Sequence, residues 1–294
     1  MPAKACAALL LACVLWAVSF IATKKALAST PPLTVVALRL VLSAACFLGW
    51  LAVTRRKLPL AALRDSVWRL ILLSLCGGGL HYGLQTVGLQ YTSASNGSLY
   101  AVTAPVTIAI LGVLFLRERP TLGKTLGIVV ALAGVLTVMG LDQLRSFELG
   151  GRVWGDLLVL ASIVLWGVFT VLGKSLTDRL GAPILTAAVT ILAAASMLPV
   201  AYWELGSRGA SLQSVSLEAW VSIAFLGIGC SFLATLLYFV ALEMSESQKV
   251  GVFLYTIPPM TAMVAYLVLD EALGLRFFLG SALVIGGVIL TERS

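Results

Sequence analysis

The stretch VLWAVSFIATKKAL at residues 14–27 recurs as VLWGVFTVLGKSL at residues 164–176. The match places Trp16 on Trp166 and Lys24 on Lys174, an offset of 150. At an offset of 153, five later positions also match: Tyr100, Pro105, Glu118, Gly127 and Gly134 fall on Phe253, Pro258, Glu271, Gly280 and Gly287. Shared Trp, Pro and Glu positions argue against chance similarity between apolar sequences. We therefore predict two repeats, residues 1–141 and 142–294.

The composition of the 294 residues is that of a membrane protein. Apolar residues make up 60% and charged residues 11%, whereas roughly a quarter of a soluble domain is charged. Apolar stretches of about 18 residues or more, the length that crosses a hydrocarbon core of ~30 Å, recur along the whole chain. The alternating segments of a membrane β-barrel are absent. We therefore predict an all-α integral membrane protein with ten spans, at residues 6–28, 33–53, 67–90, 94–116, 122–140, 154–176, 182–203, 218–241, 247–269 and 274–291.

The first span also resembles a secretory signal, because Lys4 precedes it and the small-residue triplet Ala26-Leu27-Ala28 ends it. Its apolar run, however, is longer than the about 7 to 15 residues of a signal. It also has a repeat partner at residues 164–176. We expect the first span to be retained as a helix of the bundle.

Each repeat holds five spans, an odd number, so the second repeat must be inverted in the membrane relative to the first. Inverted repeats are typical of secondary transporters, in which two similar halves exchange conformations around a central cavity. With the N-terminus in the cytoplasm, 13 Lys and Arg residues lie at the inner ends and 6 at the outer ends. This bias predicts that both termini are cytoplasmic. It also explains the net charge of +7 through anionic lipid, without nucleic acid.

The few polar residues do not suggest an enzyme, a metal site or a cofactor. All five cysteines lie in or beside apolar spans without CxxC spacing, and the only histidine, His81, has no acidic or cysteine partner at helical spacing. We expect the cysteines to be packing residues. A membrane-embedded enzyme is therefore disfavoured, and a receptor or scaffold that does not transport stays as a lesser alternative.

The motifs together resemble those of the EamA family of the drug/metabolite transporter superfamily. They are Leu-Trp near the middle of spans 1 and 6, a proline within spans 4 and 9, and P-x12-E before a glycine-rich helix. The resemblance implies a cavity surrounded by spans 1, 3, 4, 6, 8 and 9. Spans 5 and 10, with Gly123, Gly127, Gly280, Gly286 and Gly287, look like close-packing helices. Within the family, the aromatic residues and the histidine of the chain resemble those of the YddG-type amino-acid exporters of bacterial inner membranes.

Two prolines interrupt spans 4 and 9 at corresponding positions. Pro105 and Pro258 each remove a helix hydrogen bond, which should leave the carbonyls of Ala101 and Leu254 free. They are either simple kinks or helix breaks beside a cavity. Around the first proline, a stripe of polar residues at helical spacing is expected to face the interior: Asn96, Tyr100, Thr103 and Thr107.

The other candidate cavity residues are aromatic or neutral and polar. Span 3 contributes His81 with Tyr82 and Gln85. Spans 1 and 6 each contribute a tryptophan and a residue three positions later on the same helix face. Spans 8 and 9 each contribute one aromatic ring. These residues are His81, Tyr82, Gln85, Trp16, Ser19, Trp166, Phe169, Tyr238 and Phe253. We interpret His81 as a polar contact of a substrate more than as a proton carrier.

The candidate faces carry no carboxylate, and this limits the substrate. A zwitterionic or amphipathic solute can be held by neutral dipoles and aromatic rings, as large or aromatic amino acids would be. Lys249 matches the charge pattern of the inner rim. Arg39 lies about six residues inside its span, within snorkelling reach of the outer interface, so we expect it to be a structural anchor.

The sequence thus predicts a secondary transporter that exports amino acids or related metabolites by alternating access, without ATP. The alternative within the superfamily is an exporter of drugs or other metabolites coupled to protons. Since only His81 has a suitable ordinary pKa and depth, we expect downhill, facilitated efflux. A bacterial inner membrane is the expected location. The oligomeric state stays open, and a monomer is compatible with the sequence.

Overall fold

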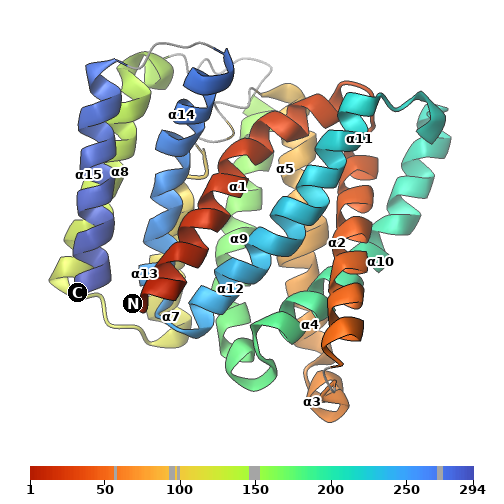
Figure 1. The fold of residues 1–294 in the computed structure, drawn as a ribbon, viewed down its shortest axis with the longest axis horizontal. Coiled ribbons are helices and arrows are strands. Elements are labelled where there is room, and N and C mark those ends of the chain that lie inside the picture. Colours follow the sequence, from red (N-terminus) through yellow and green to blue (C-terminus); the bar gives the residue numbers. More distant parts are fainter. Residues whose placement is uncertain (56–57, 93–96, 98–99, 146–152, 270–273) are drawn as a thin grey trace.

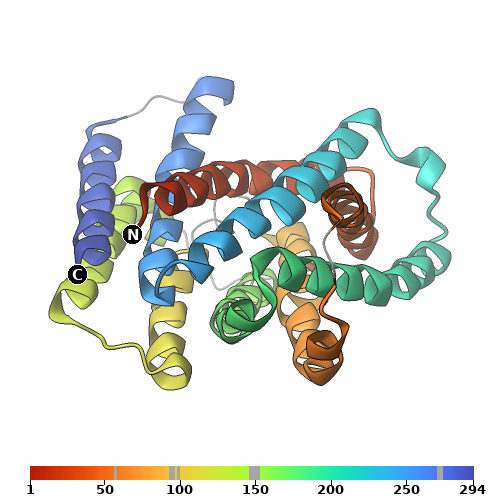
Figure 2. The same cartoon turned by 60° about the horizontal axis from the view of Figure 1, so that its bottom comes forward.

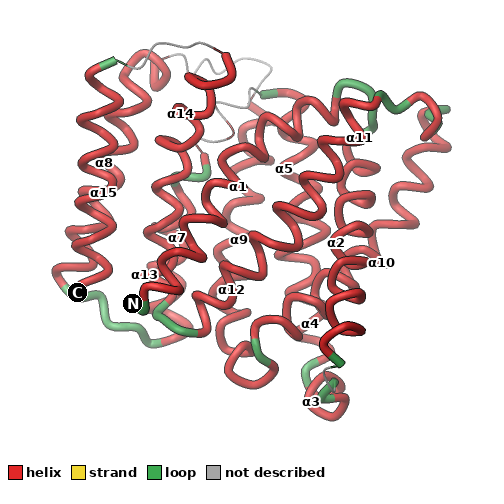
Figure 3. Tube along the Cα trace, viewed as in Figure 1, coloured by secondary structure: helices red, strands yellow, loops and turns green. Residues whose placement is uncertain are grey.

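The computed structural model describes residues 1–294 except 56–57, 93–96, 98–99, 146–152 and 270–273. Every regular element in the described residues is helical (Figure 3). The first half consists of α1 (Ala3–Leu27), α2 (Pro32–Thr54), α3 (Leu60–Asp65), α4 (Val67–Ser74), the π-helical turn η1 (Leu75–Gly79), α5 (Leu80–Tyr91), α7 (Thr103–Leu116) and α8 (Leu122–Arg145).

The second half is also built from helices. Its elements are α9 (Val153–Leu180), α10 (Ala182–Arg208), the 3-10 turn η2 (Leu212–Ser214), α11 (Leu217–Ala224), the π-helix η3 (Phe225–Ala234), α12 (Thr235–Glu243), α13 (Ser247–Val252), the 3-10 turn η4 (Phe253–Thr256), α14 (Ile257–Leu269) and α15 (Leu275–Arg293). Consecutive elements such as α4, η1 and α5 form one continuous helix, Val67–Tyr91.

Seven of the described helices are long and apolar enough to cross a membrane, judged by length and composition. They are Ala3–Leu27, Pro32–Thr54, Val67–Tyr91, Val153–Leu180, Ala182–Arg208, Leu217–Glu243 and Leu275–Arg293. Two shorter apolar helices, Thr103–Leu116 and Leu122–Val138, lie at the positions predicted for spans 4 and 5. The described residues therefore form an all-helical structure whose helices suit a membrane, and ten crossings stay a prediction.

The helices form one bundle in which both termini lie at the same end (Figure 1). The N-terminal ammonium group of Met1 forms an ion pair with Glu292, two residues before the C-terminal Ser294. Helix α1 runs obliquely across one side of the bundle, where it packs against η3, α11, α12 and α14 (Figure 2). The first span is therefore an integral part of the packed core.

Helices α8 and α15 pack closely because glycines face each other across their interface. A Cβ atom at Gly127 would lie 2.7 Å from the carbonyl oxygen of Gly287, and one at Gly134 would lie 2.7 Å from that of Gly280. The repeat alignment pairs Gly127 with Gly280 and Gly134 with Gly287, so each contact is the counterpart of the other. Gly286, in contrast, faces open space and contributes nothing to this close packing.

The π-helical turns also occur at corresponding places of the two halves. η1 begins at Leu75, and the repeat offset of 153 places its counterpart at Ile228. Ile228 lies within η3, which covers Phe225–Ala234. A π-helical turn inserts extra backbone into a helix and is frequent at functional sites. The glycines of η1 allow close contact with α9 and α10, since a Cβ at Gly77 would lie 2.3 Å from the Phe169 ring and one at Gly78 2.4 Å from the Ala193 Cβ.

Candidate functional site

A cavity lies in the bundle beside the central aromatic residues. Its volume is about 60 Å³, and it is partly open to its surroundings. Its walls come from α1, α2, α5, α7, α9, α14 and the turns that precede α7 and α14. The lining residues are Trp16, Ser19, Phe20, Arg39, His81, Tyr82, Gln85, Ala101, Ala104, Ile163, Trp166, Leu254 and Ile257.

Six of the predicted site residues meet in this cavity: Trp16, Ser19, His81, Tyr82, Gln85 and Trp166. Helical spacing explains the grouping, since Trp16 and Ser19 share one face of α1, and His81 and Gln85 share one face of α5. These residues come from elements of both halves. The cavity thus joins the two halves at the bundle centre.

An aromatic cluster borders one side of the cavity. The Trp16 and Trp166 rings meet edge to face with centroids 5.2 Å apart, and the Tyr238 ring lies 5.4 Å from Trp16 and 5.5 Å from Trp166. Phe169 packs 5.4 Å from Trp166. Tyr238 and Phe169 are almost fully buried and support the tryptophans without lining the cavity, although both were predicted to line it. The Tyr238 hydroxyl lies 3.3 Å from that of Thr170.

His81 is buried, and one of its ring nitrogens is already used. Nδ1 lies 2.7 Å from the carbonyl oxygen of Ser162, and because a carbonyl can only accept, Nδ1 carries the proton and donates it. In the neutral imidazole, Nε2 is then a hydrogen-bond acceptor. The ring is held between Tyr82 and Trp166, with centroids 4.7 and 5.2 Å away. His81 therefore offers a fixed acceptor in the cavity wall.

Arg39 is a cavity residue that sequence reasoning missed. The sequence predicts a structural anchor within snorkelling reach of the outer interface, and the reach to the interface is wrong because the side chain is buried in the bundle and only 2% exposed. Its Nε donates to the Ser231 hydroxyl over 2.9 Å, and its Cζ lies 3.9 Å from the centroid of the Tyr82 ring. The only sequence signal was the charge itself, deep in an apolar span.

The polar stripe predicted around Pro105 does not form one face of the cavity. The stripe assumed one unbroken helix, but α7 begins at Thr103. Tyr100 is buried and Thr103 is exposed, and neither lines the cavity. The Thr103 hydroxyl donates instead to the Tyr100 carbonyl over 2.8 Å. Asn96 lies outside the described residues.

In the second half, Phe253 lies in η4, where it is buried away from the main cavity. It borders a separate, mostly apolar groove between α1 and α15. The Sγ of Cys13 lies 3.4 Å from the Phe253 carbonyl. Phe253 therefore belongs to the packing between α1 and η4.

Pro105 and Pro258 lie in the first turns of α7 and α14, directly after irregular backbone. The expectation that the carbonyls of Ala101 and Leu254 would be free is wrong. The Ala101 carbonyl accepts from the Ala104 N–H over 3.0 Å, and the Leu254 carbonyl accepts from Ile257. In both halves the bond spans three residues, as in a 3-10 turn, which satisfies the carbonyl that proline leaves without its usual partner.

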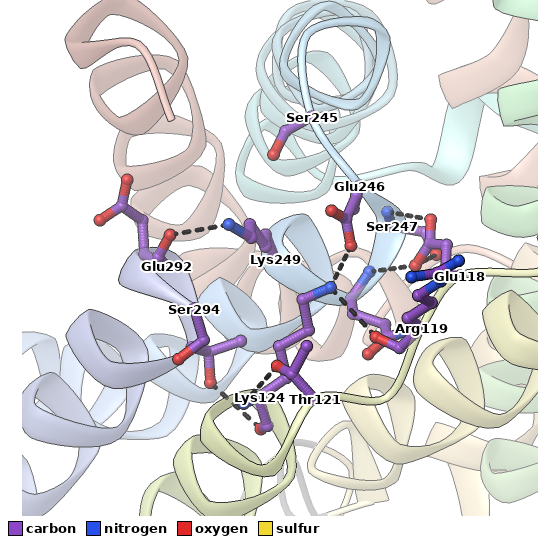
Figure 4. Close-up of polar contacts among 12 residues, drawn as sticks. Glu118, Arg119, Thr121, Lys124, Ser245, Glu246, Ser247, Lys249, Glu292 and Ser294 are labelled. Atoms are coloured by element: carbon purple, nitrogen blue, oxygen red, sulfur yellow. Dashed lines mark hydrogen bonds and ion pairs between the residues drawn. The ribbon is translucent and has the colours of Figure 1, made fainter.

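The end of the bundle that carries the termini holds a group of polar contacts, drawn in Figure 4. The Glu118 carboxylate accepts from the backbone N–H groups of Ser247, over 2.6 Å, and Gln248, over 3.2 Å, and from the Ser247 hydroxyl over 2.9 Å. It thereby caps the N-terminus of α13 from the other half of the chain. We call these residues, with Lys124 and Glu246, the terminal-side seal.

Two lysines hold the loop beside this seal. Lys124, only 3% exposed, forms an ion pair with Glu246 and donates to the Arg119 carbonyl over 3.1 Å. Lys174 donates to the carbonyls of Leu242, over 2.8 Å, and Ser245. Both lysines thus tie the loop between α12 and α13 to its neighbours.

Lys249 lies nearby and donates to the Glu292 carbonyl over 3.0 Å, at the rim where the sequence pattern placed it. Among the described residues, no group of three His, Cys, Asp or Glu side chains is arranged to hold a metal ion. The polar groups that line the cavity are one guanidinium, one imidazole, one amide and the hydroxyls of Ser19 and Tyr82, beside several aromatic rings.

The model of the family described as the EamA-like transporter family matches residues 3–140 and 153–293. The chain belongs to the EamA-like transporter family. Relatives of this EamA-like protein are themselves described as uncharacterized transporters. One from Archaeoglobus fulgidus is 30% identical over 284 residues, which cover 96% of this chain and 95% of that protein. YvbV of Bacillus subtilis is 27% identical and covers 95% of this chain and 88% of its own length.

A third relative is described as an inner membrane transporter, YhbE of Escherichia coli. It is 27% identical over 189 residues, 63% of this chain and 59% of that protein. A solved crystal structure superposes on the EamA-like chain with a TM-score of 0.79, covering 100% of this chain and 99% of the other at 19% identity. That likeness shows a shared fold. The family and its relatives make the chain a membrane transporter of the drug/metabolite transporter superfamily.

Proposed function

We propose that this transporter exports amino acids, chiefly large or aromatic ones, and related small metabolites by alternating access, as YddG-type exporters do. The observation that carries the proposal is the cavity between the two halves, which combines the Trp16 and Trp166 rings with the polar groups of His81 and Gln85. Rings with a few fixed polar groups are the usual composition of a site for an amphipathic small molecule.

Alternating access is supported by the correspondence between the halves. The glycine contacts of α8 and α15 are reciprocal under the repeat alignment, and the backbone before Pro105 matches that before Pro258. The family model also matches each half separately. Two such halves, inverted relative to each other, can exchange conformations and so move the opening of the cavity from one face of the membrane to the other.

The observed conformation fits one state of that cycle. Phe20, Arg39 and Gln85 lie six or seven residues from the ends of α1, α2 and α5 that face away from the termini. The opposite end is closed by the terminal-side seal of Glu118, Lys124, Glu246, Ser247 and Gln248. With the termini in the cytoplasm, as the distribution of Lys and Arg favours, this is an outward-facing state in a bacterial inner membrane.

The test is solute flux in proteoliposomes containing the purified protein. We expect saturable, facilitated flux of labelled L-phenylalanine or L-tryptophan, with half-saturation in the range usual for small-molecule carriers and no requirement for ATP. Empty liposomes measure passive diffusion. Flux equal to that of empty liposomes for every amino acid would contradict the substrate proposal.

A second candidate, an exporter of aromatic metabolites or drugs other than amino acids, is favoured by the apolar part of the lining: Phe20, Ala101, Ala104, Ile163, Leu254 and Ile257. Competition by sugars, nucleosides and organic cations in the same assay separates the two candidates. A solute that competes fully where amino acids do not would select the second.

A further inference from the structure

The cavity wall contains a buried positive charge held in a fixed orientation. Arg39 is 2% exposed, its Nε donates to Ser231 on η3 over 2.9 Å, and its Cζ lies 3.9 Å from the centroid of the Tyr82 ring on α5. A hydroxyl and a ring from two other elements therefore hold the guanidinium group in place. Such support is what a preorganised binding group requires.

Arg39 forms no ion pair with any described residue. No described carboxylate oxygen therefore lies within 4.0 Å of its nitrogens. Three of the acids have other tasks at helix ends. Glu118 caps α13, Glu204 accepts from the N–H and hydroxyl of Thr34 in α2, and Glu243 accepts from the Ala182 N–H of α10. A charge buried in a membrane protein is costly unless it is paired or meets a polar cavity.

The guanidinium group carries five N–H donors in one plane. The Ser231 contact uses the Nε donor, and the Tyr82 ring covers one face of the group. The terminal nitrogens are the donors that match the two oxygens of a carboxylate. Arg39 lines the same cavity as Trp16 and Trp166. One small molecule can therefore place an oxyanion on these nitrogens and its apolar part on the rings.

We propose that Arg39 is the anion subsite of this cavity, and that the transported solute has a carboxylate, or a similar planar oxyanion, joined to an apolar or aromatic part that packs on the tryptophans. This proposal rests on the proposed transport function and narrows its substrate class. It predicts that organic cations without an oxyanion are excluded. It also replaces the expectation, drawn from the sequence, that neutral dipoles alone hold the solute.

The competing explanation is that Arg39 only joins α2, α5 and η3. The two explanations differ in ligand selectivity, because a purely structural arginine affects all ligands alike. Isothermal titration calorimetry on the purified protein in detergent measures this with three probes of nearly equal shape: phenylacetate, phenylacetamide and phenethylamine. L-Phenylalanine is the fourth ligand.

We expect the wild-type protein to bind phenylacetate at least tenfold more tightly than phenylacetamide, with phenethylamine weakest. Arg39→Gln should lower the affinity for phenylacetate about 10-fold to 100-fold, the size expected for loss of a charge-assisted contact. It should lower the affinity for phenylacetamide less than about threefold, so that the preference for the carboxylate is lost. Equal affinities for the two probes in the wild type, or an equal loss of both in Arg39→Gln, would overturn the proposal.

Two milder variants keep the test decisive if Arg39→Gln does not fold. Arg39→Lys keeps the charge but not the two-pronged donor geometry. Ser231→Ala removes the tether of Nε and keeps the guanidinium. Both should weaken phenylacetate more than phenylacetamide, and an equal effect on the two probes in both variants would overturn the proposal.

The outcomes also separate this proposal from the proposed function. Arg39-dependent binding of phenylacetate without any flux of L-phenylalanine would support the subsite and contradict amino-acid transport. Flux of L-phenylalanine with unchanged carboxylate preference in Arg39→Lys and Arg39→Gln would support transport and contradict the subsite. A wild-type protein that binds none of the four ligands would contradict the subsite.

Discussion

The indole rings of Trp16 and Trp166 meet edge to face at the centre of the bundle, with centroids 5.2 Å apart and ring planes at 83°. These two residues occupy matching positions of the repeated stretch that begins each half. Residues related by a two-fold axis contact each other only where they lie close to that axis. The contact is therefore what inverted repeats with an axis through the centre of the bundle would produce, and it borders the cavity.

Trp16→Phe and Trp166→Phe should weaken binding of an aromatic amino acid about 2-fold to 12-fold each. The smaller ring keeps the site apolar but loses part of an aromatic contact worth about 0.5–1.5 kcal/mol. Calorimetric titration gives the dissociation constants. Trp203→Phe is the matched control because Trp203 is 67% exposed and lies outside the cavity, and it should leave binding unchanged. Equal affinity in all three variants would place the binding site elsewhere.

Gly287→Ala should destabilise the bundle by about 1–3 kcal/mol, the cost of overpacking. Its new Cβ would lie 2.5 Å from the Gly127 carbonyl oxygen and from the Ala131 nitrogen. Gly286→Ala, one residue away, meets nothing within 4 Å and should be neutral or slightly stabilising, since alanine favours helix. Thermal unfolding in detergent, followed by circular dichroism, compares the two. A lower Tm for Gly286→Ala than for Gly287→Ala would contradict the packing described for α8 and α15.

Glu118→Gln should loosen the terminal-side seal. The neutral amide keeps the shape of the side chain but loses charge-assisted bonds to Ser247 and Gln248, so the bundle should open more often at this end. The natural thiol of Cys13, which is fully buried, reports on this opening through its rate of maleimide labelling, once the other four cysteines are replaced. We expect labelling several-fold faster than in the parent protein.

The control for the seal is Glu218→Gln. Glu218 forms an exposed ion pair with Lys25, and such pairs contribute little to stability. Its removal should leave labelling of Cys13 unchanged. If Glu118→Gln labels no faster than this control, the Glu118 contacts do not limit the opening of the terminal side.

A pH gradient across the proteoliposome membrane should not drive accumulation of substrate against its own gradient. His81 has its Nδ1 hydrogen-bonded to the Ser162 carbonyl and is buried between rings, which suits a fixed acceptor better than a proton carrier. His81→Ala should therefore weaken binding and leave transport downhill. Uphill flux in the wild type that disappears in His81→Ala would establish proton coupling instead.

The sequence predicted the helices well because hydrophobic length fixes them locally. Predicted spans such as 33–53 and 182–203 agree with Pro32–Thr54 and Ala182–Arg208. Spacing within one unbroken helix also placed residues correctly, as for His81 with Gln85. The prediction that Tyr100 and Thr103 share one face of the cavity was wrong because α7 begins only at Thr103. Pro105 indicated a helix break but not its position.

Arg39 and Glu118 show what local patterns cannot supply. The depth of Arg39 in its span was known, but its partners Ser231 and Tyr82 lie 192 and 43 residues away in sequence, and only packing reveals them. Glu118 stood out as the end of a repeated motif. Its use as a cap for α13 depends on a contact across 129 residues. Long-range partners of this kind decide whether a charge is an anchor, a seal or a binding group.

Counterflow in proteoliposomes tests the central claim most directly, namely that the cavity carries an aromatic amino acid across the membrane. Vesicles loaded with unlabelled L-phenylalanine are diluted into a trace of labelled L-phenylalanine, and internal label is followed with time. We predict a transient accumulation above that of protein-free vesicles, reduced in Trp166→Phe and competed by other aromatic amino acids. No accumulation in the wild type, for L-phenylalanine or any other amino acid, would contradict the account.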